Sequence, residues 1–365
     1  MGKRDDGTSA APPQRSQLME ETFEHFRDAV KLAVDARLGA LLDARVAAAA
    51  QHGPDVEVLA AAVRSLAMRG GKRLRAVLLA VAFEGYGGGG GGLGDDAGLA
   101  GAAIELLQTY LLIHDDVMDG DELRRGGPSV HASLRDRFGS ARAGETGAIL
   151  AGDFASALAQ DALLSVSVGP ERVALAAREL ARMQIDVVCG QLLDMRAGAN
   201  DRAGVEAMHT LKTASYTVRG PLLIGAILAG ASAAQKAALE RFATPLGVAF
   251  QLRDDLLGTF GDPARTGKPA ATDLREGKRT ALVVEISGDP EVQALLSRVS
   301  GANHEDDDVQ ALAMHIERSG ARARVEARLA ALALEAEAAL DAVEMNPRGQ
   351  ALLAAAAKAL VERES

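Results

Sequence analysis

Cysteine and aromatic residues are scarce in this chain of 365 residues, and tryptophan is absent. The single cysteine, Cys189, cannot form an intrachain disulfide, and no residues near it have the spacing of a metal site. A reducing, cytoplasmic location is therefore expected. The low aromatic content, 3%, and the alanine-rich stretches 47–50 and 354–357 favour helices.

Basic residues are fewer than acidic ones, 40 against 50, which gives a formal net charge of -10. The broad basic patches that a nucleic-acid surface requires are missing, because Lys and Arg occur only in small clusters. The N-terminus lacks a signal-peptide core, and the most apolar run, residues 221–234, is shorter than the ~18 residues of a membrane span. These features predict a soluble protein without a membrane span, which binds a small anionic ligand and no nucleic acid.

Strand-like alternation and internal repeats are also missing. From Leu18 onward apolar residues recur at intervals of three and four, and turn residues such as Gly53-Pro54 and Gly169-Pro170 interrupt them. We predict an all-α fold of ten or more helices in one domain, residues 16–365, after a disordered tail, residues 1–15. The glycine run 87–92 lacks the Lys-Ser or Lys-Thr pair of a phosphate-binding loop, so we expect a loop between helices.

Three aspartates gather at the end of an apolar stretch, residues 104–120, which reads IELLQTYLLIHDDVMDG. Asp115 and Asp119 are four residues apart and Asp116 and Asp119 three, so a helix crowds their carboxylates onto one sector. Gly120 is expected to end this helix, and the negative end of the helix dipole then adds to their repulsion. A magnesium ion relieves both effects, because it takes carboxylate and phosphate oxygens as ligands. The alternative is a solvated acidic helix end.

Small basic clusters occur near this site and far from it. Arg124 and Arg125 follow the aspartates directly, and their forked donors suit phosphate oxygens. The segment 70–75, GGKRLR, is expected to place Lys72 and Arg75 one turn apart at a helix start, where an anion binds favourably.

A second aspartate-rich stretch, residues 250–280, predicts a second metal-facing wall. Its candidate residues are Gln251, Asp254, Asp255, Lys268 and Lys278. Between the two stretches, Lys212 and Thr213 begin KTASYT, which offers an ammonium group and several hydroxyls. Two acidic walls and three cationic patches match two diphosphates, one held through metal and one held directly by Lys and Arg.

No pair of nucleophile and base is evident, since Cys189 and His114 have no partners in the sequence and suit packing or surface roles. Ionisation of a diphosphate needs no protein nucleophile, only stabilisation of the charge on the leaving group by metal ions, Lys and Arg. It also needs a dry apolar cavity, which a helical bundle provides between its helices.

On these residues the chain resembles the trans-isoprenyl diphosphate synthases, also called polyprenyl synthetases, from about GGKRLR to the C-terminus. Eight segments occur in the family's order: GGKRLR, LIHDDVMDGDELRRGGPSVH, AGDF, GQLLD, KTASYT, QLRDDLL, GDPARTGKP and DLREGKRT. The resemblance implies an all-α homodimer that condenses isopentenyl diphosphate with an allylic diphosphate, namely dimethylallyl, geranyl or farnesyl diphosphate. It also implies a central active-site cavity in which two aspartate motifs face each other and three Mg²⁺ ions bridge the allylic diphosphate.

The resemblance also implies residue roles. The implied metal ligands are Asp115, Asp116, Asp119, Asp254 and Asp255. The implied catalytic set is Asp115, Asp116, Asp119, Arg124, Lys212, Asp254 and Lys268. The allylic diphosphate is implied to contact Arg124, Lys212, Gln251 and Lys268, with Thr213 and Lys278 as further substrate-binding residues. Isopentenyl diphosphate is implied to bind Lys72, Arg75, Gln108 and Arg125.

Two positions depart from the family pattern. Gln108 stands where many members carry histidine, and either side chain donates to a diphosphate oxygen. Gly258 stands where the second motif usually has its third aspartate, four residues after Asp254, which puts the outer edge of that wall in doubt. Activity is expected to survive because Asp254 and Asp255 remain.

Tyr110 precedes Asp115 by five residues and therefore lies about 7.5 Å away along a helix axis. With Leu111 beside it, the ring is expected to close the floor of the product tunnel; the alternative is a tyrosine packed in the core. In the family this pattern implies the short-chain geranylgeranyl type, with farnesyl diphosphate as the near alternative.

Two rival interpretations stay open. A terpene cyclase that ionises a diphosphate shares the first aspartate motif but needs no site for a second diphosphate, so GGKRLR and Arg125 weigh against it. An inert regulatory subunit of a heteromeric synthase would keep the fold, and Gly258 favours that interpretation.

Overall fold

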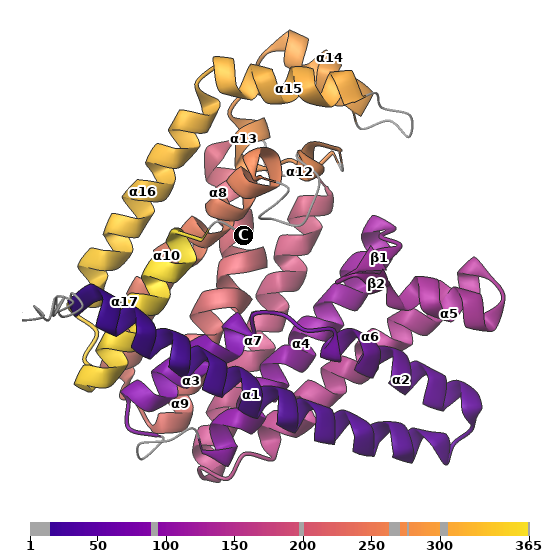
Figure 1. Cartoon of the computed structure of the whole chain (residues 1–365), viewed down its shortest axis with the longest axis vertical. Helices are drawn as coiled ribbons and strands as arrows, with labels where there is room; N and C mark the ends of the chain where they lie inside the picture. The colour runs from indigo at the N-terminus through magenta and orange to yellow at the C-terminus, as the bar shows by residue number, and fades with distance from the viewer. Residues whose placement is uncertain are drawn as a thin grey trace, which may run out of the picture.

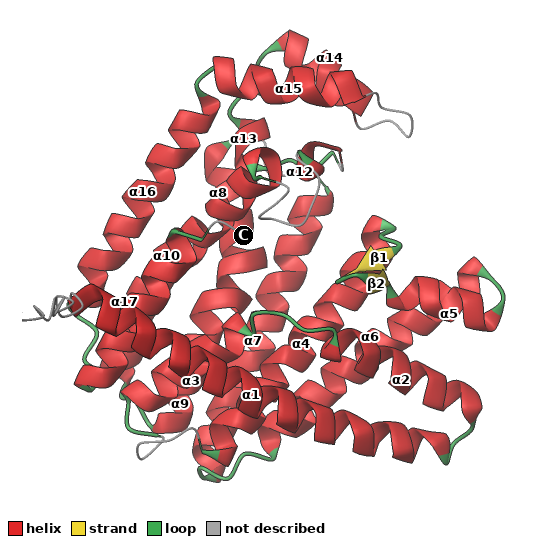
Figure 2. Cartoon of the chain, viewed as in Figure 1, coloured by secondary structure: helices red, strands yellow, loops and turns green. Residues whose placement is uncertain are grey.

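The chain is helical almost throughout its described residues, as Figure 2 shows. The computed structural model describes residues 15–88, 94–196, 201–262, 271–275, 277–299 and 306–363. The predicted tail lies outside these residues except for Arg15, where the first helix begins, and so does Lys268. Most of the glycine run lies outside them as well.

Helices make up most of the described chain and follow one another through short connections. In chain order they are α1 (Arg15–Ala50), α2 (Pro54–Met68), α3 (Leu74–Gly85), α4 (Asp95–Asp119), α5 (Val130–Phe138), α6 (Ala141–Leu164), α7 (Pro170–Met195), α8 (Arg202–His209), the π-helix η1 (Thr210–Arg219), α9 (Gly220–Ala229), α10 (Ala233–Phe260), α12 (Thr272–Arg275), α13 (Ala281–Val284), α14 (Pro290–Val299), α15 (Asp306–Arg318), α16 (Ala321–Leu340) and α17 (Pro347–Val361). In the described ranges the strands are β1 (Leu123–Arg124) and β2 (Gly127–Pro128), which pair antiparallel as a small hairpin after α4.

Turn residues in the sequence mark several helix ends. Proline stands in the first turn of α2, α7 and α17, where its missing N–H costs no hydrogen bond. Gly120 ends α4 in the left-handed region, at φ 73°, which only glycine adopts without strain. The end of α4 fixes where its aspartates lie.

The core is built around α4, which packs against α1, α2, α3 and α6. By length and composition α4 could cross a membrane, but 72% of its most apolar stretch is buried inside the fold, as in the core helix of a globular protein. Residues 221–234, the most apolar run in the sequence, lie elsewhere, and most of them form the buried helix α9. Figure 1 shows α14, α15 and α16 at the opposite end of the molecule from α2 and α5.

The π-helix η1 lies between α7 and α10, which both contact it. At Gly190 of α7 an added Cβ would lie 2.7 Å from Lys212 Cα, so only glycine lets α7 approach η1 this closely. A π-helix has an extra residue per turn and is frequent at functional sites. In this fold it carries Lys212 and Thr213 into the space between the two helices.

Candidate functional site

Two adjoining cavities open between α4, α7, η1 and α10. The polar cavity has a volume of about 360 Å³, and its charged lining residues are Asp194, His209, Lys212, Asp254, Asp255, Asp273, Lys278 and Arg279. The apolar cavity has a volume of about 400 Å³, and its apolar and aromatic lining residues are Tyr110, Leu111, Leu112, Met118, Val187, Val188, Leu192, Met195 and Tyr216. Both cavities are lined by Lys212 and Thr213, so a space for an anionic head and a space for an apolar tail adjoin at these two residues.

The first wall is the C-terminal end of α4, where the predicted aspartates lie. Asp116 is fully buried, and one of its oxygens, Oδ1, accepts from Arg124 Nε at 2.6 Å. Its other oxygen, Oδ2, has no hydrogen-bond partner among the described residues. A buried carboxylate oxygen without a donor is costly, and a cation would satisfy it. The residues of this wall therefore fit a hard divalent metal ion.

Electrostatics support the same conclusion. Burial raises the pKa of Asp116 to about 6, against the lowering effect of Arg124. Asp119 is exposed at the helix end, yet desolvation by the surrounding walls and then the charge of Asp115 raise its pKa to about 6. Both shifts disfavour the charged form of the carboxylates, and a bound cation would reverse them.

Residues of α7 complete the first wall, and sequence reasoning assigned no role to them. Gln191 Nε2 donates to Asp115 Oδ1 at 3.0 Å, and Asp194 Oδ2 lies 2.5 Å from Lys212 Nζ. The same ammonium lies 4.0 Å from Asp115 Oδ1. Gln191 and Asp194 are three residues apart in the GQLLD segment, and that spacing on a helix was the available signal.

Lys212 lies between these carboxylates as a positive charge. Burial lowers the pKa of Lys212, but Asp194 and Asp115 outweigh this effect and raise it above its ordinary value. The ammonium is therefore charged near neutral pH. Beside a diphosphate it would supply fixed positive charge at the junction of the two cavities.

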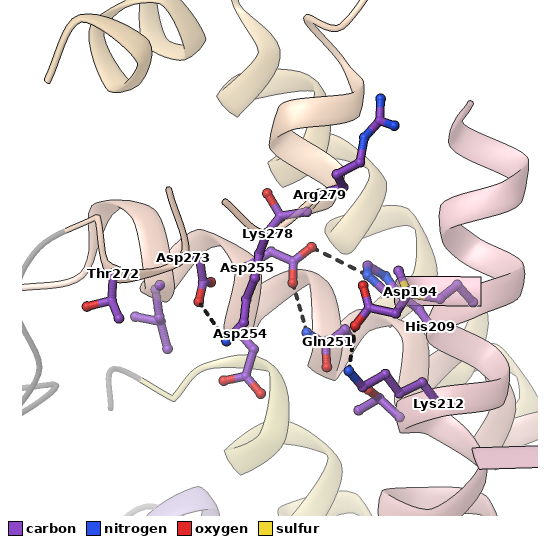
Figure 3. A pocket seen from close by; sticks show the side chains of 15 residues that line it. Asp194, His209, Lys212, Gln251, Asp254, Asp255, Thr272, Asp273, Lys278 and Arg279 are labelled. Carbon is purple, nitrogen blue, oxygen red and sulfur yellow. Dashed lines mark hydrogen bonds and ion pairs between the residues drawn. The ribbon is translucent and has the colours of Figure 1, made fainter. Parts of the chain in front are cut away.

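The second wall belongs to α10, and its two aspartates differ in their surroundings. Asp254 is half-exposed in the polar cavity and forms an ion pair with Arg363. Asp255 is buried, accepts from Gln251 Nε2 at 2.8 Å and from the Ala281 backbone N–H at 2.9 Å, and lies 3.5 Å from His209 Nε2 (Figure 3). Asp255 thus joins α10 to α8 and α13, whereas Asp254 faces the open space.

The two walls lie on adjoining cavities, since Asp254 and Asp255 line the polar cavity and Asp115 lines the apolar one. Lys278, which lines the polar cavity beside Asp254, acts electrostatically on Asp119 of the first wall. Arg124 bridges Asp116 and Asp121, with 2.7 Å to Asp121 Oδ2, so it is tied to the first wall. Sequence reasoning did not identify Asp121 as its partner.

Arg75 of the GGKRLR segment and Arg125, which follows the first motif, meet at Gln108. With its amide oriented so that the oxygen faces the arginines, Gln108 accepts from Arg75 at 2.9 Å and from Arg125 at 3.2 Å. Arg75 also donates to Thr217 at 2.9 Å, and its guanidinium lies 4.3 Å from the centre of the Tyr216 ring. We name Lys72, Arg75, Gln108 and Arg125 the basic patch.

The helix start near the basic patch differs from the prediction. The helix α3 begins at Leu74, so Lys72 precedes it, and Arg73 adopts a left-handed conformation with φ 48°. This turn sends the Arg73 side chain into the core, where it pairs with Glu105 at 2.9 Å and Asp35 at 2.8 Å. The prediction that Lys72 and Arg75 lie one turn apart at the helix start is therefore wrong, because Lys72 lies outside the helix and the backbone turns at Arg73.

The C-terminal end of the described chain lies between the basic patch and the second wall. Burial lowers the pKa of Arg363 to about 10, and the charges of Arg253 and Arg75 add to this effect. Burial also lowers the pKa of Lys72, with Arg363 as the second cause. Arg363 is therefore close enough to Lys72 and Arg75 of the basic patch for their charges to interact.

Tyr110 lies at the apolar cavity, with Leu111 beside it. Its side chain is buried, and its ring meets His114 edge to face with 4.8 Å between centroids. His114 in turn lies 3.1 Å from the Ile149 carbonyl, so it has a packing contact and no nucleophilic partner in the described chain. Cys189, the other residue considered as a nucleophile, is exposed.

Comparisons with known proteins agree on one family. The family model described as polyprenyl synthetase matches residues 56–316. Geranylgeranyl diphosphate synthase of Sulfolobus acidocaldarius is 37% identical over 238 residues, which cover 63% of this chain and 67% of that protein. Geranylfarnesyl diphosphate synthase of Aeropyrum pernix is 35% identical over 281 residues, which cover 74% of this chain and 83% of that protein.

A solved structure shares the fold closely. The crystal structure of geranylgeranyl pyrophosphate synthase from Corynebacterium glutamicum, complexed with isoprenyl diphosphate and magnesium, matches with a TM-score of 0.84 and 34% identity. The match covers 92% of this chain and 99% of that one. The relatives are named for products of different chain length, so their names do not assign one product length to this chain.

Proposed function

The chain belongs to the polyprenyl synthetase family and is a trans-prenyltransferase, and we propose that it condenses isopentenyl diphosphate with an allylic diphosphate to give geranylgeranyl diphosphate. The observation that carries this proposal is the contrast between two anion sites. The polar cavity presents carboxylates that suit metal-bound diphosphate, while the basic patch presents Arg75 and Arg125 beside Gln108. A synthase needs both sites and a cyclase only the first.

Magnesium would be held by Asp115 and Asp119 of α4 and by Asp254 of α10, in a cluster of about three ions. Asp116 supports this set through Oδ2, which accepts no hydrogen bond from the described residues, and Asp255 holds the second wall in place. When bound, magnesium supplies positive charge that stabilises the departing diphosphate.

The chain's own residues carry the remaining steps. The residues proposed to hold the allylic diphosphate, while its carbon–oxygen bond breaks and the electron pair leaves with the diphosphate, are Arg124, Lys212, Thr213, Gln251, Lys268 and Lys278. The apolar cavity excludes water from the allylic cation. The double bond of isopentenyl diphosphate, oriented by the basic patch, attacks the allylic carbon and forms the new carbon–carbon bond. The adjacent carbon then gives a proton to the departed diphosphate, which restores a double bond.

A homodimer is part of the proposal. Besides the lining of the apolar cavity, α7 exposes the large apolar side chains Leu175 at 42%, Ile185 at 64% and Leu193 at 37%. An exposed apolar face of this kind suits association with a second copy.

Incubation of the purified chain alone with isopentenyl diphosphate, an allylic diphosphate and Mg²⁺ tests the proposed function. Elongated diphosphates are expected. A cyclic hydrocarbon would instead indicate a cyclase, and no turnover would indicate a regulatory subunit that needs an active partner.

Tyr110→Ala is expected to lengthen the product beyond twenty carbons, because removal of the buried ring opens the floor of the apolar cavity. Chromatography of the dephosphorylated products measures this directly. Tyr110→Phe keeps the ring and serves as the matched control, with unchanged length expected. Equal product lengths in Tyr110→Ala and the wild type would refute the flooring role.

The Mg²⁺ requirement is expected to rise as the pH falls below about 6. Asp116 and Asp119 have pKa values raised to about 6, so both are increasingly protonated below that pH and ionised above it. Because protons compete with metal, the Mg²⁺ concentration for half-maximal rate should rise by up to about tenfold per pH unit for each proton displaced. Magnesium titrations of the rate between pH 5.5 and 7.5 measure this.

Asp119→Asn serves as the comparison, since the diphosphates themselves also titrate near this pH. The variant should show a shallower pH dependence of its remaining Mg²⁺ requirement than the wild type. Identical slopes would assign the effect to the substrates and contradict the role of the α4 carboxylates.

A further inference from the structure

Position 258 lacks a side chain, and the structure shows what fills its place. Gly258 lies on α10 four residues after Asp254 and so on the same face of the helix. A Cβ built at Gly258 would lie 2.5 Å from Asp273 Cγ and closer still to Asp273 Oδ2. The Asp273 carboxylate therefore occupies the volume that any side chain at position 258 would enter.

We propose that Asp273 supplies the third carboxylate of the second metal-facing wall, at the place that glycine at position 258 leaves open. The proposal rests on the proposed function, because it concerns the same metal ions. It makes Gly258 and Asp273 a complementary pair, in which the carboxylate comes from α12 and not from α10.

The short helix α12 fixes where Asp273 lies. Leu274, the next residue, is only 1% exposed and belongs to the same apolar cluster as Leu252 and Leu256 of α10. The Asp273 carbonyl accepts from the Lys278 backbone N–H at 2.9 Å, which closes the turn after α12. With the backbone held on both sides, the Asp273 side chain is directed to α10.

The Asp273 carboxylate also faces the space that the metal ions would occupy. Figure 3 shows Asp273 beside Asp254 and Lys278 in the polar cavity. Lys278 Nζ lies 3.9 Å from Asp273 Oδ1 and also acts on Asp119 across the cavity. Asp273 thus lies near Asp254 and is paired with a lysine whose charge reaches Asp119 of the first wall.

Asp255 is a poor candidate for the same task. Its two oxygens accept from Gln251 and from the Ala281 backbone N–H, and it is 3% exposed. Turning it toward the metal ions would break both hydrogen bonds. Asp273 has a side chain that is 20% exposed and lines the polar cavity beside Asp254.

The test is calorimetric binding of inorganic diphosphate, with and without Mg²⁺, which reports on the metal site without turnover. Asp273→Asn keeps the size of the side chain and is expected to weaken Mg²⁺-dependent binding by about tenfold or more. Gly258→Ala should give a similar loss, because its methyl group displaces the Asp273 carboxylate. Glu337→Ala, an exposed position on α16, is the control and should bind as the wild type does.

Moving the carboxylate from position 273 to position 258 tests whether the metal ions need a carboxylate at this place in the wall. Gly258→Asp combined with Asp273→Ala should recover Mg²⁺-dependent binding to within about threefold of the wild type, whereas Asp273→Ala alone should not. Circular dichroism of every variant without metal checks that each is folded. In the Asp273→Ala background, Gly258→Ala should have no further effect on binding.

Wild-type binding by Asp273→Asn, or failure of the folded swap variant to recover, would overturn the inference. Its failure is distinct from failure of the proposed function. If the wild type elongates allylic diphosphates while Asp273→Asn binds normally, this inference alone is wrong. If the wild type makes no product while the losses and the recovery occur as expected, the proposed reaction is wrong and the carboxylate assignment stands.

Discussion

Asp115→Ala is expected to abolish measurable turnover, a loss of at least about 10³-fold in kcat, while the fold persists. The carboxylate lies where the first wall meets α7 and η1, within reach of Gln191 and Lys212. Without it the metal ions lose a ligand, and the departing diphosphate loses the charge that stabilises it. The fold should persist because Lys212 keeps Asp194 as a partner at 2.5 Å.

Steady-state kinetics measure the loss of turnover, and thermal melts check that the fold persists. Asp95→Ala, at the opposite end of the same helix with a side chain 91% exposed, is the matched control and should keep wild-type kcat. A kcat for Asp115→Ala within about tenfold of the wild type would contradict a metal role, since loss of one preorganised charge contact typically costs more.

Arg75→Ala should raise the KM for isopentenyl diphosphate by about 10- to 100-fold, as expected for loss of charge-assisted hydrogen bonds. The KM for the allylic diphosphate should change little, because that substrate is proposed to bind through metal in the polar cavity. Arg75 is held on its other sides by Gln108, Thr217 and the Tyr216 ring, which orient it before any substrate binds.

The control for this substitution is Arg64→Ala. Arg64 is an exposed arginine of α2 whose pairing with Asp43, at 2.5 Å, is remote from both cavities. It should leave both KM values unchanged. An equal rise in both KM values for Arg75→Ala would show that one site serves both substrates, as a cyclase-like enzyme would have.

Local pattern was enough to predict the fold class and many helix boundaries. Apolar residues at intervals of three and four define the helices. Gly53 and Gly169 precede helices and Gly120 ends one, each with a positive φ that favours glycine. The hairpin β1–β2 was not expected, since two residues per strand carry no alternation to detect. The π-helix η1 was not expected either, because close packing at Gly190 is a tertiary effect.

The candidate site was predictable where its residues form runs. Asp115, Asp116 and Asp119 are spaced for one helix face, so their grouping followed from the helix alone. Asp194, Asp273 and Arg363 reach the same region from α7, α12 and the C-terminal end, and no sequence spacing relates them. Arg73 stands between the basic residues of GGKRLR in the sequence, but its positive φ turns it into the core.

One diphosphate binding through metal and the other directly through Lys and Arg is the central feature of the proposed reaction. Calorimetric titration of a non-ionisable allylic diphosphate analogue and of isopentenyl diphosphate, each with Mg²⁺ and with a chelator, tests it most directly. We expect the chelator to abolish binding of the allylic analogue and to leave a site for isopentenyl diphosphate that Arg75→Ala weakens. Loss of both binding events with the chelator, or retention of both, would contradict this division.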